Sequence, residues 1–154
     1  MLIRLIGAAT SDFYREFGKP EDGKHCLLCG RGRDCAEHLL GYACMAELSP
    51  GAAATWKEIV EILKRHFPRH PLSYHYYTGD LRAKFIINPN CEHLRELRLS
   101  RSELQETGLD ILIRRYAYRK VLYRTNMLKR MGKIGKGKGV IAGTTALARA
   151  DYTN

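Results

Sequence analysis

Four residues between positions 26 and 44 have the types and the spacing of metal ligands. The first two are Cys26 and Cys29, which are separated by two residues and followed by Gly30. His38 comes after eight further residues, and Cys44 after five more. Thiolates and imidazole are preferred ligands of Zn²⁺, and four protein ligands close a tetrahedral shell. The spacing therefore predicts a structural zinc site without an open position for catalysis.

A second ligand set fits the same segment. Cys35 lies three residues before His38, so the two side chains share one face of a helix and Cys35 can replace Cys44. Three reserve ligands lie elsewhere in the chain: His25, Cys91 and His93. The alternative to a metal is a group of free buried thiols, which are common in protein cores. A CxxCG knuckle followed so closely by two more Cys and a His favours the metal.

Local signals place these ligands on a turn and a short helix. Asp34 and Glu37 have the spacing of a capping box, which predicts a helix over residues 35–40. His38 and Cys44 are six residues apart and would lie on different faces of a continuous helix. The helix must therefore end between them, and Gly41 is the expected end.

The segment from Cys26 to Cys44 resembles the Cys- and His-containing segment near the C-terminus of reverse transcriptases from non-LTR (LINE-like) retrotransposons. The matching residues are Cys26, Cys29, Gly30, Asp34, Glu37, His38, Leu39, Leu40 and Cys44. The strong part of the match covers residues 24–67, and a weaker part reaches about residue 124. The resemblance implies a zinc knuckle followed by a Trp-containing helix, an apolar stretch ending at Pro89 and an aromatic, Arg-rich helix.

Two features depart from that family. The spacer between His38 and Cys44 has five residues where four is usual. The polymerase metal motif, Tyr or Phe followed by a variable residue and two Asp, is missing from the sequence. The resemblance therefore implies a non-catalytic C-terminal remnant that binds RNA or DNA. It does not imply polymerisation.

The positive charge of the chain is concentrated in its C-terminal third. The formal net charge is +10, from 26 basic and 16 acidic residues. Residues 111–150 contain eleven Lys or Arg and no acidic residue, so the remaining part is close to neutral. A patch of one sign is the expected footprint of a polyanion. The alternative is a basic tail that only increases solubility.

Helical periodicity dominates the remainder. Thr55 and Glu58 have the spacing of a capping box before an apolar face over residues 56–67, and Ser49-Pro50-Gly51 is interpreted as a break. Ser100 and Glu103 form another such pair, opening one long helix over residues 103–131. Residues 81–87 fit either a helical turn or a buried strand. Short helices are expected over residues 11–17 and 92–97.

The predicted fold is mainly α: a small zinc-stapled finger packed on a helical bundle, with a long C-terminal helix and a flexible basic tail. The expected divisions are an N-terminal extension (1–23), the zinc-binding module (24–48), a helical domain (49–131) and a Gly/Lys-rich tail (132–154). The apolar runs are too short to span a membrane. The clustered Cys and the absence of a secretory signal favour an intracellular protein, with the nucleus as one compatible compartment.

The candidate nucleic-acid contacts are basic side chains of the long helix and the tail. They are Arg114, Arg115, Arg119, Lys120, Arg124, Lys129, Arg130, Lys133, Lys136 and Lys138. Tyr116 and Tyr123 are interleaved with them, but we expect both rings to pack in the core. His66, His70 and His75 are interpreted as surface loop residues.

The predicted function is a zinc-dependent, non-enzymatic module that binds the phosphate backbone of RNA or DNA. The alternative from a different class is a zinc-finger adaptor that binds a protein partner and no nucleic acid. A third hypothesis, a hydrolase with an open zinc site, requires a metal-bound water in place of the fourth protein ligand.

Overall fold

A computed structural model of the chain describes residues 25–31, 35–41, 44–73 and 79–132. Over these residues the protein is mainly helical and contains no strand, which confirms the predicted fold class. The α-helices are α2 (Ala36–Leu40), α3 (Pro50–His66), α4 (Gly79–Ile87), α5 (Arg101–Thr107) and α6 (Leu109–Arg130). Three short 3₁₀ helices connect them: η1 (Met45–Leu48), η2 (Pro71–Ser73) and η3 (Glu92–Leu97).

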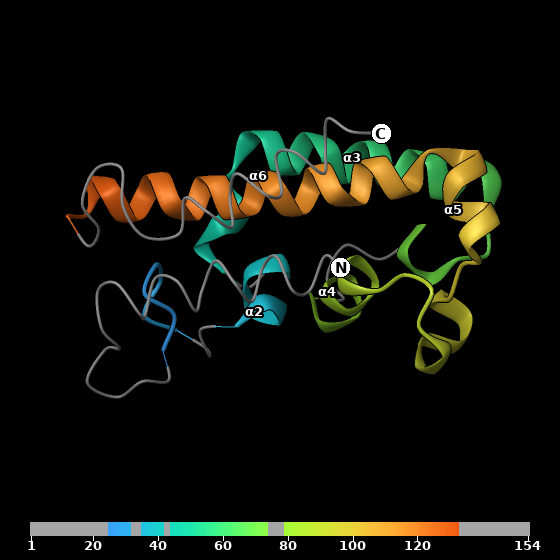
Figure 1. Cartoon of the computed structure of the whole chain (residues 1–154), viewed down its shortest axis with the longest axis horizontal. Coiled ribbons are helices and arrows are strands. Elements are labelled where there is room, and N and C mark those ends of the chain that lie inside the picture. Colours follow the sequence, from blue (N-terminus) through green and yellow to red (C-terminus); the bar gives the residue numbers. More distant parts are fainter. Residues whose placement is uncertain (1–24, 32–34, 42–43, 74–78, 133–154) are drawn as a thin grey trace.

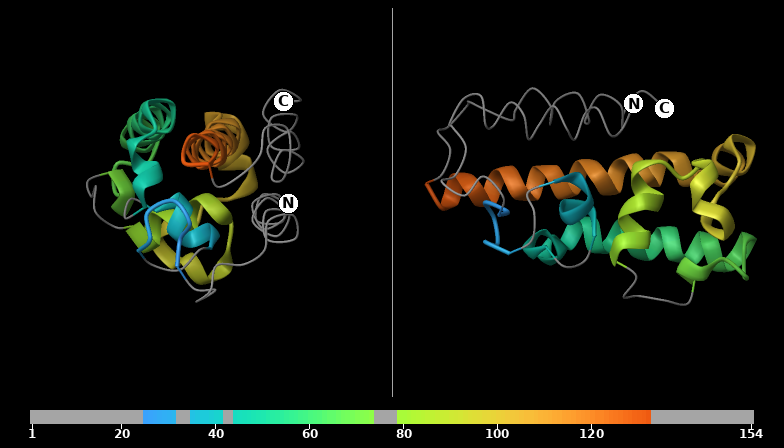
Figure 2. Two further views of the ribbon diagram at one scale, coloured as in Figure 1. Left: turned by 90° about the vertical axis from the view of Figure 1, so that its left-hand side faces the viewer. Right: turned by 90° about the horizontal axis from the view of Figure 1, so that it is seen from below.

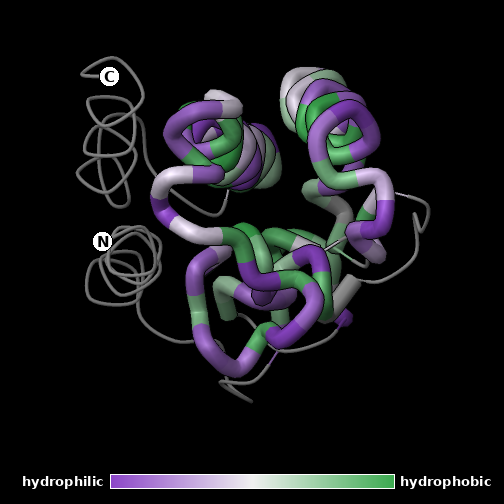
Figure 3. The backbone as a smooth tube through the Cα atoms, turned by 90° about the vertical axis from the view of Figure 1, so that its right-hand side faces the viewer, coloured by the Kyte–Doolittle hydropathy of each residue, from purple (hydrophilic) through white to green (hydrophobic). Residues whose placement is uncertain are grey.

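The two longest helices form one layer. α3 and α6 run antiparallel and side by side, and the shorter α2 and α4 pack beneath them (Figures 1 and 2). Hydrophobic residues of the lower layer lie toward the long helices (Figure 3). Trp56 of α3 and Tyr116 of α6 meet between the layers, with ring centroids 5.7 Å apart. Tyr116 is fully buried, as the sequence predicted, and Tyr123 packs partly buried against the core.

Helix α3 begins earlier than the sequence pattern indicated. Ser49 is its N-cap and accepts a hydrogen bond from the Ala52 N–H at 3.2 Å, and Pro50 occupies the first turn. Proline suits this position because its missing N–H would have no helical partner there. The predicted break at Ser49-Pro50-Gly51 is therefore a helix start. The predicted cap at Thr55 is wrong, because Thr55 lies inside the helix and donates to the Gly51 carbonyl.

The predicted long C-terminal helix is two helices. The capping box of Ser100 and Glu103 is confirmed, with both of its hydrogen bonds formed at the start of α5. Gly108 then adopts a left-handed conformation, with φ of 76°, and separates α5 from α6. Glycine adopts this conformation at little cost, and it ends many helices. The periodicity continues across the break because both helices bury apolar residues in the same core.

Helix α4 settles the ambiguous stretch at residues 81–87 in favour of a helix. Ala83, Phe85 and Ile86 are fully buried in it. Residues 92–97 form 3₁₀ rather than α-helix, with Arg95 at a positive φ of 51°. The helix expected over residues 11–17 and almost all of the predicted tail lie outside the described residues, as do Asp34 and His75.

His70 is a buried histidine, which corrects its interpretation as a surface residue. Its ring is 5% exposed and packs edge-on against Phe85. Its Nε2 donates to the Leu97 carbonyl at 3.1 Å, and its Nδ1 accepts from the Leu72 N–H at 3.2 Å. Both ring nitrogens therefore suit the neutral form. Burial lowers the pKa of His70, and the Leu97 hydrogen bond partly opposes this effect.

The lowered pKa predicts a pH dependence of stability. The unfolded chain protonates His70 near the ordinary value of about 6.5, above the folded pKa, so unfolding takes up a proton as the pH falls. We expect the stabilising contribution to be complete above pH 6.5 and to decline below it. Urea unfolding at pH 7 and pH 5 should show a smaller acid loss for His70→Gln than for the unmodified chain. An equal loss in both would contradict this role.

Candidate metal centre

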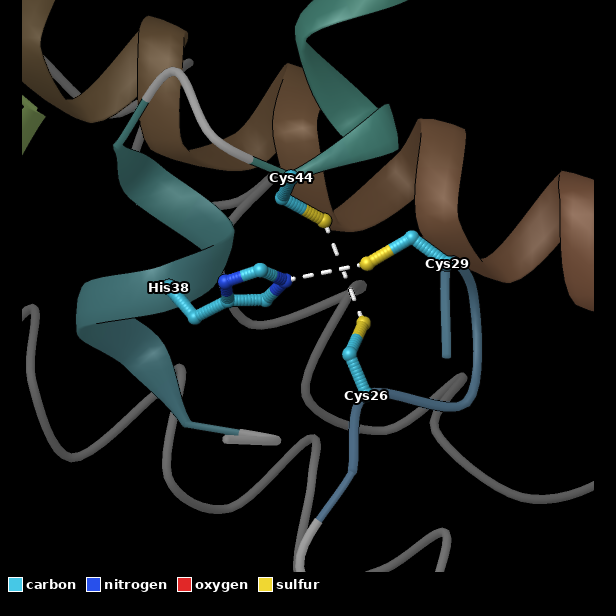
Figure 4. Close-up of side chains that lie close together, drawn as sticks. All are labelled: Cys26, Cys29, His38 and Cys44. Atoms are coloured by element: carbon cyan, nitrogen blue, oxygen red, sulfur yellow. Dashed lines mark hydrogen bonds between the residues drawn. The ribbon is translucent and has the colours of Figure 1, made fainter. Parts of the chain in front are cut away.

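The first two candidate ligands lie on a tight turn. The Gly30 N–H donates to the Cys26 carbonyl at 2.8 Å, which closes the turn. Gly30 has a φ of 69°, a left-handed conformation that favours glycine. Closing the turn in this way places the Cys26 and Cys29 side chains on the same side (Figure 4). The tight turn that the CxxCG sequence predicted is confirmed.

The other two candidate ligands flank the end of α2. His38 lies in α2, which ends at Gly41, where the Gly41 N–H donates to the Glu37 carbonyl at 3.1 Å. The chain then leaves the helix axis, and Cys44 becomes the N-cap of η1. The Cys44 Sγ accepts a hydrogen bond from the Ala46 N–H at 3.5 Å. The predicted helix end at Gly41 is confirmed, and it lets His38 and Cys44 face the same point.

The four ligand atoms converge on one point. The sulfur atoms of Cys26, Cys29 and Cys44 and a nitrogen of His38 all lie within 4.8 Å of one another (Figure 4). The Cys26 and Cys44 sulfurs are 3.9 Å apart, and Cys29 Sγ lies 3.2 Å from His38 Nε2. A tetrahedral zinc shell has sulfur–sulfur edges of about 3.8 Å, from Zn–S bonds of about 2.3 Å. These four residues could therefore hold a metal ion.

Cys35 does not belong to this group. It is the residue that precedes α2, where its backbone is extended, and its side chain makes no capping hydrogen bond. Among the described residues, the ligand atoms of Cys26, Cys29, His38 and Cys44 lie together, and the reserve ligands His25, Cys91 and His93 are not part of this group. The geometry thus favours Cys44 over Cys35 as the fourth candidate ligand.

The electrostatics of the group fit a bound cation. Cys26 and Cys44 are 3% and 2% exposed. The hydrogen bond with Cys26 and then burial raise the pKa of the Cys44 thiol above its ordinary value. Two buried sulfurs in contact cannot both ionise at low cost unless a cation neutralises them. A divalent ion between them supplies that charge, so the donor set suits a metal.

An ion cluster of Glu47, Arg82 and Lys120 contacts the chain next to two of the candidate ligands. The Glu47 carboxylate in η1 pairs with Lys120 Nζ at 2.8 Å and with Arg82 Nη1 at 3.0 Å. Lys120 also donates to the Gly41 carbonyl at 3.1 Å, and the Tyr116 hydroxyl donates to the Leu40 carbonyl at 2.8 Å.

Lys120 is 1% exposed, so it is not placed to contact phosphate. This corrects its assignment as a nucleic-acid contact.

The other predicted nucleic-acid contacts differ in exposure. Arg119 donates to the Gly51 carbonyl and to Thr55, so it joins α6 to α3. Arg124 is 2% exposed and is likewise a buried residue rather than a surface one. Arg114, Arg115 and Lys129 are half-buried, as is Arg119, and Arg130 is exposed. Lys133, Lys136 and Lys138 lie outside the described residues.

Sequence reasoning did not identify Glu47 and Arg82 as parts of the site. They are separated by 35 positions along the chain, and Arg82 lies 4.3 Å from the Trp56 ring centroid. The sequence feature that indicated a buried charge partner was Lys120, a charged residue within an otherwise apolar face of the helix. Such a position requires a buried partner, but the sequence does not show which acidic residue supplies it.

No protein-family profile, curated protein or solved structure matches the chain. None of the helices among the described residues has the length and apolarity needed to cross a membrane. The features that bear on function are therefore the geometry of the Cys/His group and the positive charge of α6.

Proposed function

We propose that Cys26, Cys29, His38 and Cys44 bind one structural Zn²⁺. The observation that carries the proposal is the convergence of their four ligand atoms within 4.8 Å. Zinc suits three soft thiolates and one imidazole in tetrahedral geometry. Four protein ligands leave no position for a reactive water, which argues for a structural role and against the hydrolase hypothesis. The ion would join the knuckle to α2 and to the start of η1.

Metal content tests the ligand set directly. We expect the purified chain to bind one equivalent of zinc, and Co²⁺ substitution to give the absorption of sulfur-to-cobalt charge transfer. Cys44→Ser should lose most of this affinity, because one thiolate of the shell is removed. Cys35→Ser is the matched control and should bind zinc normally. Loss of zinc in Cys35→Ser with retention in Cys44→Ser would overturn the assignment.

We further propose that this zinc module is non-enzymatic and binds the phosphate backbone of nucleic acid through α6 and the segment that follows it. The proposal is supported by positions 111–150, which contain no acidic residue and nine basic residues besides the buried Lys120 and Arg124. Arg114, Arg115, Lys129 and Arg130 are at least partly accessible on α6. The resemblance to the C-terminal segment of retrotransposon reverse transcriptases agrees with RNA or DNA as the ligand and with origin as a remnant of such an enzyme. An intracellular location, including the nucleus, is part of the same proposal.

Salt dependence tests the nucleic-acid proposal. Each neutralised phosphate contributes about −0.7 to −0.9 to the slope of log affinity against log salt concentration. Truncation after Gly132 removes Lys133, Lys136, Lys138 and Arg149, and should weaken binding to all sequences and flatten this slope. Affinity and slope unchanged by the truncation would exclude the tail as a contact.

A protein-interaction adaptor is the second candidate. Leu48, at the end of η1 and four residues after Cys44, is 66% exposed, and Met131 at the end of α6 is 43% exposed. Large exposed apolar side chains are typical of protein contacts when they form a patch. Absence of nucleic-acid binding at low salt would favour this function over the first.

A further inference from the structure

The three sulfur atoms among the candidate ligands differ in their access to solvent. Cys26 and Cys44 are 3% and 2% exposed, and their sulfurs lie 3.9 Å apart. Cys29 is only half-buried, and its Sγ makes an exposed hydrogen bond to the Arg31 carbonyl at 3.3 Å. Cys29 is therefore the sulfur of the group that a small solute reaches most easily.

The three sulfurs are also close enough to react with one another. The ligand atoms lie within 4.8 Å, so Cys29 has two thiol neighbours, Cys26 and Cys44 (Figure 4). A disulfide has an S–S distance of about 2.05 Å, so the two sulfurs must approach each other by less than about 3 Å. Rotation of one cysteine side chain between staggered rotamers moves its sulfur over a comparable distance. Cys35 is half-buried as well, but it is not part of the group.

A hydroperoxide can supply the oxidant for disulfide formation at Cys29. Its terminal oxygen is transferred to the Cys29 sulfur, which becomes a sulfenic acid, while the hydroperoxide is reduced to water or an alcohol. The thiol of a neighbouring ligand then attacks the sulfenic sulfur, forms the S–S bond and releases the oxygen as water. The two cysteines together lose two electrons to the hydroperoxide, and the oxidation state of the zinc does not change.

We propose that Cys29 is the oxidation-sensitive ligand of the zinc site, and that a hydroperoxide joins it to Cys26 or Cys44 in a reversible disulfide that releases the ion. The disulfide removes two of the four ligands, and the remaining two do not close a tetrahedral shell. This inference rests on the proposed zinc site and adds a mode of regulation to it. A dithiol reductant reverses the disulfide by exchange, so zinc binding is then restored.

Peroxide treatment of the zinc-loaded full chain tests the inference. Released zinc is followed with a chromophoric chelator, and dimedone added at early times labels sulfenic acid for mapping by mass spectrometry. Cys29→His keeps four ligands of the kinds that zinc binds and removes the accessible thiol. Cys35→Ser is the matched control, because Cys35 is also half-buried but lies outside the group.

We expect hydrogen peroxide to release the zinc, to produce the first dimedone label on Cys29 and, without dimedone, to lower the mass of the chain by two hydrogen atoms. Dithiothreitol should restore zinc binding, and Cys35→Ser should release zinc within threefold of the unmodified rate. Cys29→His should release it at least tenfold more slowly, and if this variant does not bind zinc, the labelling of the unmodified chain decides.

Two results would overturn the inference while leaving the zinc site in place. One is a first label on Cys26, Cys44 or Cys35, and the other is a zinc-loaded chain that resists excess peroxide. Failure of the unmodified chain to bind zinc overturns the proposed site instead.

Discussion

Removal of the proposed zinc with a strong chelator is expected to unfold the segment around α2 while α3 and α6 stay helical. A five-residue helix is too short to be stable alone, and α2 depends on the burial of Leu39 and Leu40 and on the tether at His38. At a free zinc concentration 1,000 times its dissociation constant, the bound ion contributes about 4 kcal/mol to stability. Chelation should therefore lower the free energy of unfolding by about that amount.

Hydrogen exchange gives the local measurement. The Gly41 amide, bonded to the Glu37 carbonyl, should lose its protection in chelator, whereas amides in the middle of α3 should keep most of theirs. Cys44→Ser in excess zinc should reproduce the chelated state, and Cys35→Ser should behave as the unmodified chain. If the exchange pattern and the unfolding midpoint are the same with and without chelator, the ion does not stabilise this segment.

The group of Cys26, Cys29, His38 and Cys44 was the part of the molecule most accessible to sequence reasoning. The knuckle at Cys26 and Cys29 is a local motif, because two residues and a following glycine determine the turn. The end of α2 followed from a geometric requirement, since His38 and Cys44 can face one point only if the helix stops between them. The choice of Cys44 over Cys35 depended on the path of the chain after Gly41, and the structure brings Cys44 into the group.

The start of α3 shows why a neighbouring signal was misinterpreted. Proline and glycine in sequence are equally compatible with a break and with the first turn of a helix. The structure adds a tertiary reason for the glycine, because a Cβ at Gly51 would lie 3.2 Å from Cδ of Arg119. Arg119 is 68 residues away in sequence, and its position on α6 is set by the packing of the two long helices. A local rule has no access to that contact.

The assignment of the basic residues of α6 was limited in the same way. Charge density marked the helix as cationic, but Lys120 lies on the buried side together with Tyr116, where Glu47 neutralises it. Helical periodicity showed that Lys120 interrupts an apolar face. It did not identify the carboxylate, which comes from η1, three residues after Cys44. Long-range electrostatic pairing is specified by the fold and not by spacing along the chain.

Glu47→Gln is expected to be strongly destabilising, because it removes the carboxylate that the buried Arg82 and Lys120 share. Removing one partner of a buried ion pair costs about 3–5 kcal/mol. The Glu47 side chain is 33% exposed, so we expect a loss near the lower limit, about 3 kcal/mol, in urea unfolding of the metal-saturated protein. Glu58→Gln, on the exposed face of α3, is the matched control and should change stability by less than about 0.5 kcal/mol.

A double-mutant cycle separates charge from packing at this cluster. Lys120→Met removes one of the two cations, so Glu47→Gln should cost less in that background than in the unmodified chain. We expect a favourable coupling of at least about 1 kcal/mol, because the double variant lacks both the carboxylate and one of the cations that pair with each other. Purely additive losses would mean that the two residues contribute only through shape. The coupling would then be absent, and α6 would be held to η1 by packing around Tyr116 rather than by the Glu47 carboxylate.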